Sequence, residues 1–194
     1  MRLQFTILTL GLFITQAYSQ AKNTLSATYA AGASNLTFFG RRQSDASYES
    51  QSGNIFGITY AQKLNRSFSF ETGINFTNSN VKESSFGLGH TVNSYDNIKA
   101  VSIPALLKLS FLKYLYADFG FNISIQTNHT NYSLASNQSG IGCEGSAGAQ
   151  YDLGKIKLFV APYFQILSVG KFDRKASDED LLNSGVKFGI GYNF

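Results

Sequence analysis

The sequence predicts an all-β fold: an eight-stranded antiparallel up-and-down transmembrane β-barrel with short periplasmic turns and four long extracellular loops. Three observations predict it. Apolar and polar residues alternate along eight segments, the connections between these segments are alternately short and long, and the last segment alternates up to the final residue, Phe194. Alternation with a period of two puts one kind of side chain on each face of a strand. A barrel in a membrane needs an apolar outer face and tolerates a polar interior.

Eight segments carry the strand pattern. The clearest alternation lies in the third, where Phe68, Phe70, Ile74 and Phe76 oppose polar and small residues. The seventh is apolar on both faces, so its sequence leaves open which side points outward. The predicted strands are residues 24–32, 54–62, 67–78, 98–111, 114–126, 140–151, 156–167 and 185–194.

The connections between the predicted strands alternate in length. Three are short, at residues 63–66, 112–113 and 152–155, and four are long and polar, at residues 33–53, 79–97, 127–139 and 168–184. Short turns on one rim and long loops on the other are typical of outer-membrane barrels. Aromatic residues suited to the membrane interface gather near the predicted short-turn rim: Tyr60, Phe68, Tyr151, Tyr192 and Phe194.

The N-terminal segment is typical of a signal peptide. Arg2 precedes a mostly apolar stretch at residues 3–14, and Ala17, Tyr18 and Ser19 follow with a small-x-small pattern. We expect cleavage between Ser19 and Gln20, so that residues 1–19 are the signal peptide and residues 20–194 form one outer-membrane β-barrel domain. The apolar stretch is too short for a membrane-spanning helix, which needs about 20 residues. The alternative is a buried N-terminal element of a cytosolic fold.

Charged residues stand in the middle of several predicted strands, on the polar face. An eight-stranded barrel is only wide enough to hold its own side chains, so we expect these charges to pair inside the lumen and to block free flow. The alternative is a narrow ion path. The residues are Glu71, Lys108, Asp118, Glu144 and Lys187.

The same alternation would also fit a soluble barrel of the lipocalin kind, in which the apolar faces are buried. Two features weigh against this alternative: the apolar faces are rich in aromatic residues, and the chain ends directly on a strand. The final strand stops at Phe194, with Ile190 and Tyr192 on the same face. It resembles the terminal strand that the outer-membrane insertion machinery reads, so we expect these three residues to form a C-terminal insertion signal.

The sequence predicts no catalytic residues, no cofactor and no metal site. Cys143 is the single cysteine, and His90 and His129 fall in predicted loops without a partner at motif spacing. The acidic run 178–180 departs from a calcium-loop pattern and is interpreted as a solvated loop. Lysines and arginines are scattered at a net charge of +4, which argues against a nucleic-acid partner.

Four features resemble the outer-membrane β-barrel family of the Bacteroidota, often labelled PorT-like. They are the signal segment, Ser-Ile-Pro-Ala-Leu-Leu-Lys at residues 102–108, Ala-Asp-Phe-Gly-Phe at residues 117–121, and the closing Gly-Ile-Gly-Tyr-Asn-Phe. The resemblance spans essentially the whole mature chain. It implies an eight-stranded barrel and no particular chemistry.

From these observations we expect a non-enzymatic, monomeric barrel in the cell outer membrane, with an envelope-structural or surface-interaction role through its extracellular loops. Its expected partners are outer-membrane lipid, the outer-membrane assembly machinery, and an unknown surface or envelope partner. The alternatives are a membrane-embedded barrel enzyme acting on lipid or peptide, and a soluble periplasmic lipid-binding barrel.

Overall fold

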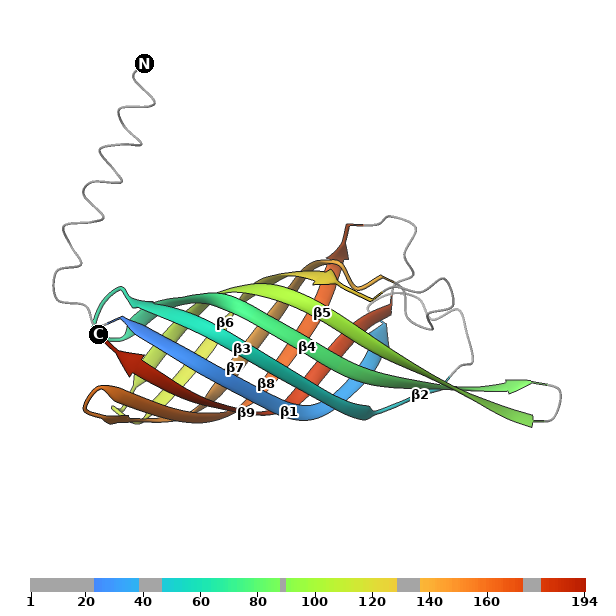
Figure 1. Cartoon of the computed structure of the whole chain (residues 1–194), viewed down its shortest axis with the longest axis horizontal. Helices are drawn as coiled ribbons and strands as arrows, with labels where there is room; N and C mark the ends of the chain where they lie inside the picture. Colours follow the sequence, from blue (N-terminus) through green and yellow to red (C-terminus); the bar gives the residue numbers. More distant parts are fainter. Residues whose placement is uncertain (1–22, 39–46, 88–89, 129–136, 173–178) are drawn as a thin grey trace, which may run out of the picture.

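The structure is a computed structural model, and it describes residues 23–38, 47–87, 90–128, 137–172 and 179–194. Among these residues, no helix is long and apolar enough to cross a bilayer. The strands wind around a common axis, with the C-terminus at one end and a long hairpin projecting from the other (Figure 1). The strands are β1 (Thr24–Phe38), β2 (Ser47–Glu49), β3 (Gln51–Lys63), β4 (Phe68–Gly87), β5 (His90–Phe111), β6 (Leu115–Gln126), β7 (Gly140–Leu153), β8 (Ile156–Lys171) and β9 (Glu179–Asn193).

The strands form one closed antiparallel sheet. Each of the eight long strands pairs with the next one along the chain, and β1 and β9 close the ring over fifteen residue pairs, from Thr24↔Asn193 to Phe38↔Glu179. The short strand β2 pairs with β4 directly beyond the β3–β4 pairing, so it lengthens the wall made by β3. The structure therefore confirms the predicted eight-stranded up-and-down barrel.

The strands are longer at the loop end than the sequence predicts. The segment 79–97, predicted as a loop, is mostly hairpin, because β4 and β5 stay paired as far as Gly87↔His90. His90 is consequently the first residue of β5 and not a loop residue. The predicted loops 33–53 and 168–184 are also shortened, because strands continue into both of their ends. Most of these residues are polar and the few apolar ones do not alternate regularly, so hydropathy does not reveal a strand that continues beyond the lipid.

The two faces of the wall differ as the alternation predicts. Large apolar side chains cover the outside; Phe121 and Ile125, for example, are 64% and 60% exposed. Inward side chains such as Asn122 are buried. An apolar exterior around a polar interior suits lipid, and it excludes the soluble barrel with buried apolar faces. The structure also settles the seventh predicted strand, because Leu158 and Val160 of β8 face outward while Phe159 and Tyr163 face inward.

Candidate functional site

The lumen contains four layers of side chains, counted from the short-turn rim. They are a polar vestibule, a layer of charges, a layer of amides and hydroxyls, and an apolar layer at the loop end. The order follows from the strand register, because inward residues at the same height come from successive strands.

The charge layer brings four of the five predicted lumen charges together in two ion pairs. Lys108 Nζ of β5 lies 3.5 Å from Glu71 Oε2 of β4, and Lys187 Nζ of β9 lies 3.8 Å from Asp118 Oδ2 of β6. Lys108 and Asp118 are direct cross-strand partners in the register. Lys108 nevertheless pairs with Glu71 of β4, the strand on its other side. Asp118 instead pairs with Lys187 of β9, which reaches it from across the lumen. The second Asp118 contact is a hydrogen bond that Ser146 Oγ donates at 2.6 Å.

The fifth predicted charge, Glu144 of β7, is buried without an ion pair among the described residues. Its Oε2 accepts a hydrogen bond from Gln165 Nε2 at 2.9 Å. Glu144 therefore connects the charge layer to the amide layer above it.

Two inward aromatic rings complete the charge layer, and the sequence analysis did not identify them as lumen residues. Lys108 Nζ lies 4.1 Å from the centre of the Tyr116 ring and 5.0 Å from that of Phe159, and the two rings meet edge to face. Tyr116 stands two residues before Asp118, so strand alternation alone places it on the same face. Phe159 lies opposite Gly189, and its ring occupies the space that a side chain at Gly189 would need.

The amide layer joins six strands through Gln165 and Asn183. Gln165 is nearly fully buried and contacts Thr77, Ser102, Glu144 and Asn183. Asn183 Oδ1 accepts hydrogen bonds from Ser34 Oγ at 2.6 Å and from Ser79 Oγ at 2.8 Å. Buried polar groups are costly unless they are paired, and here they pair across the lumen, so this layer ties opposite walls together.

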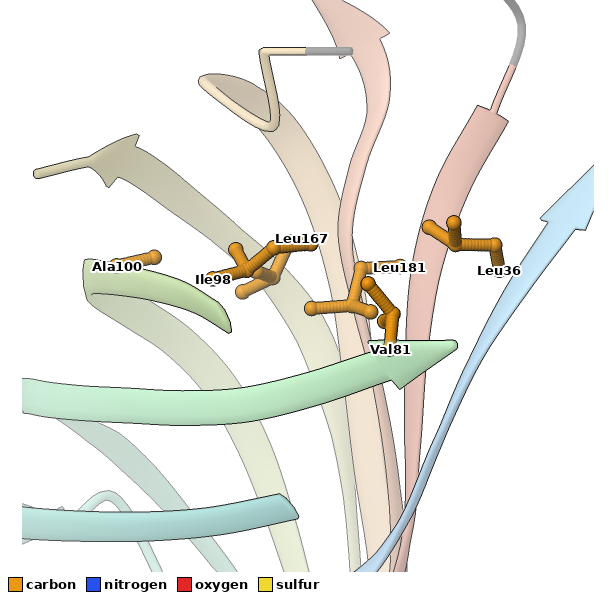
Figure 2. Close-up of a cluster of buried hydrophobic side chains, with 6 residues drawn as sticks. All are labelled: Leu36, Val81, Ile98, Ala100, Leu167 and Leu181. Carbon is orange, nitrogen blue, oxygen red and sulfur yellow. The ribbon is translucent and has the colours of Figure 1, made fainter. Parts of the chain in front are cut away.

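An apolar layer, which we call the apolar seal, lies at the loop end of the lumen (Figure 2). Its members come from five strands, and Ile98, Leu167 and Leu181 are completely buried. The buried side chain of Gln138 lies beside it, where its Oε1 accepts hydrogen bonds from the Leu181 N–H and from Ser168 Oγ. The sequence analysis missed this layer because half of its members fall in the predicted loops. The seal consists of Leu36, Val81, Ile98, Ala100, Leu167 and Leu181.

Within the part of the chain that the structure describes, the lumen holds a cavity at its short-turn end. This cavity of about 520 Å³, which we call the vestibule, lies between Lys63, Ser69, Lys108, Gln150 and Asp152. Between the charge and amide layers, only about 20 Å³ remains, next to Glu71, Glu144 and Lys187. That volume holds about one water molecule. The interior is thus a pocket that opens at the short-turn rim and ends at the filled layers.

A family model described as the outer membrane protein beta-barrel domain matches residues 5–194. The chain belongs to this outer-membrane barrel family. The protein is accordingly an outer-membrane barrel, and its short turns face the periplasm.

Solved structures similar to this chain include two bacterial outer membrane proteins. OprG from Pseudomonas aeruginosa has a TM-score of 0.58 at 16% sequence identity, with 92% of this chain and 98% of OprG covered. Ail of Yersinia pestis, in complex with the heparin analogue sucrose octasulfate, has a TM-score of 0.48 at 14% identity, with 90% and 99% covered. At this identity, the likeness to OprG shows a shared fold alone. No curated protein sequence matches the chain.

Several predicted features of this outer-membrane barrel lie outside the described residues. They are the signal peptide with its cleavage site at Ser19 and Gln20, His129, and Asp178 of the acidic run. Within the described residues, no group of three or more histidine, cysteine or acidic residues could hold a metal ion. The insertion-signal residues Ile190, Tyr192 and Phe194 face outward on β9 and at the chain end.

Proposed function

We propose that this outer-membrane barrel is a non-enzymatic, monomeric protein with a closed lumen, and that it acts in envelope structure or in surface contact through its extracellular parts. The observation that carries the proposal is the apolar seal above the amide layer. A pore would need a continuous water-filled path, and a hydrophobic constriction opposes the entry of water and ions. The same layers argue against the narrow ion path.

On the extracellular side, the hairpin of β4 and β5 offers a surface for contact with a partner. The hairpin of β4 and β5 continues past Val81, a member of the apolar seal, as far as Gly87 and His90, and β2 adds a third strand beside β4. Figure 1 shows this hairpin projecting well beyond the barrel. A hydrogen-bonded hairpin loses less conformational entropy on binding than an irregular loop does.

The finer family assignment is also part of the proposal. The segment 102–108, the run 117–121 and the closing strand support membership of the PorT-like group of the Bacteroidota. The order of charge, apolar stretch and small residues supports export by a cleaved signal peptide. N-terminal sequencing of the mature protein should begin at Gln20, and an intact Met1 in the outer-membrane fraction would contradict the export proposal.

Conductance in planar bilayers tests the closed lumen. We expect no steady current through the purified protein, whereas a large stable conductance would overturn the proposal. Turnover of outer-membrane lipid or peptide by the purified protein would overturn its non-enzymatic part. A deletion strain then separates the two roles. A variant in which residues 82–95 are replaced by a short turn should restore envelope integrity if the barrel itself is needed, and should fail to restore it if surface contact is needed.

A further inference from the structure

The vestibule carries an excess of positive charge. Five cations line it: Lys63, Arg66, Lys108, Lys113 and Lys157. Two carboxylates line it as well, and both are already paired, Glu71 with Lys108 at 3.5 Å and Asp152 with Lys157 at 3.8 Å. Five cations and two carboxylates leave a net charge of +3.

The three remaining cations stand at the entrance. Lys63, Arg66 and Lys113 are exposed and form no ion pair within the described residues. They come from three places along the chain: the end of β3, the turn before β4 and the turn before β6. Converging cations at the mouth of a concave site attract an anion and raise its local concentration.

The inner wall of the vestibule offers neutral hydrogen-bonding groups. Gln150 is buried; its Nε2 donates to Ser110 Oγ at 3.2 Å, but its Oε1 has no hydrogen-bond partner. A buried acceptor without a donor is costly, so a turn of the Gln150 amide toward the cavity that it lines would let Oε1 accept a hydrogen bond from a ligand hydroxyl. Hydroxyls of Thr24, Ser26 and Ser69 line the same cavity.

The volume of the vestibule limits the size of the ligand that it would bind. Its volume of about 520 Å³ lies within the range of small-molecule sites, about 300–1,000 Å³. Inorganic phosphate would leave most of that space unfilled. The filled lumen closes the far end, so a ligand enters and leaves on the periplasmic side.

We propose that the vestibule binds a hydroxyl-rich organic phosphate of about the size of a sugar phosphate. The entrance cations hold the phosphate, and the hydroxyl groups reach Gln150 and the serine and threonine hydroxyls inside. Two sources supply this chemistry at the periplasmic rim: a free sugar phosphate, or the phosphoglycerol headgroup of a lipid in the periplasmic leaflet.

The test measures glucose 6-phosphate binding by calorimetry, using the full mature protein in an uncharged detergent. We expect one site per barrel and weaker binding of inorganic phosphate. Replacing both Arg66 and Lys113 by Gln should weaken glucose 6-phosphate binding about tenfold or more, because hydrogen bonds to charged groups are the stronger ones. The matched control is Lys155→Gln, which removes a charge at the same rim but outside the vestibule. It should leave the affinity unchanged.

Lipid nanodiscs distinguish the two sources. If the headgroup is the ligand, glucose 6-phosphate should bind in phosphatidylcholine discs and be displaced in discs that contain phosphatidylglycerol. If the ligand is a free sugar phosphate, it should bind equally in both. Absence of binding in detergent and in both discs overturns the proposal, as does an equal loss of affinity in the Lys155→Gln control.

Discussion

Replacing Lys108 by Met tests whether the ion pairs of the lumen stabilise the barrel. Lys108 Nζ lies 3.5 Å from Glu71 Oε2 and 4.1 Å from the centre of the Tyr116 ring. Methionine is about as long as the apolar part of lysine and removes only the charge and its contacts. The carboxylate of Glu71 would stay in place at 4% exposure without its ion-pair partner.

The expected loss of stability follows from this geometry. Breaking a buried ion pair from one side costs about 3–5 kcal/mol. The pair here is long and borders the vestibule, where water screens the remaining carboxylate, so we expect about 2–3 kcal/mol in total. Lost cation–π contacts contribute about 0.5–1 kcal/mol of that. Removing both partners, in Glu71→Gln with Lys108→Met, should recover most of the loss, because replacing a whole buried pair is often close to neutral.

The assay is urea unfolding in lipid vesicles. Because the chain has no tryptophan, the folded fraction is followed by circular dichroism and by the different gel mobility of boiled and unboiled samples. Lys113→Met, at an exposed position of the rim, is the control and should not lower the unfolding midpoint. Planar bilayers should show no steady conductance for Lys108→Met. An unchanged midpoint in Lys108→Met, or a double variant whose loss equals the sum of the single losses, would refute the coupling.

Three further predictions concern the wall and its ends. Deleting Phe194 should reduce the amount of barrel in the outer membrane while export stays normal, and normal outer-membrane levels would show that the ending is incidental. Gly120→Ala should lower the free energy of unfolding by about 1–3 kcal/mol, because its Cβ would collide with the backbone oxygen of Ala105 on the neighbouring strand. Gly170→Ala, whose Cβ would meet no atom closer than 3.9 Å, should change the free energy of unfolding little. Leu112 and Lys113 have φ values of 51° and 61°, a left-handed conformation that costs about 1–2 kcal/mol per residue. Replacing Leu112 by Asn and Lys113 by Gly should therefore raise the unfolding midpoint. A lower midpoint would contradict the idea that this turn is strained.

Within the membrane, the strands and their faces can be predicted from the sequence because one face of each strand contacts lipid and the other faces a polar lumen. In β6, Phe119 and Phe121 face the lipid while Asp118 and Asn122 face the lumen. Apolar and polar residues therefore alternate along this strand. In β8, apolar residues stand on both faces, so the sequence does not show which face points outward. Phe159 and Tyr163 both point inward. Gly189 leaves space for the Phe159 ring, and that space depends on the neighbouring strand β9.

Contacts between strands that are distant in sequence were harder to predict. Knowing the register would suggest that Lys108 contacts Asp118, its direct cross-strand neighbour. The structure instead pairs Lys108 with Glu71 and brings Lys187 across the lumen to Asp118. Which partner a long inward side chain reaches depends on the height and tilt of every strand at once, and hydrophobic periodicity carries no information on either.

The order of the lumen layers makes the two ends of the barrel chemically unequal. Nearest the periplasm, the interior is open and basic; next come paired charges and amides that leave room for about one water molecule. At the extracellular end, Leu167, Leu181 and the other members of the apolar seal fill the lumen, and the buried amide of Gln138 beside them is already hydrogen-bonded. Among the described residues, Lys108 lines the cavity at the periplasmic end, and the apolar seal lies between it and the extracellular end. The closed lumen we propose would accordingly be reached from the periplasm, through the vestibule, and the proposed surface contact would use the outside of the barrel.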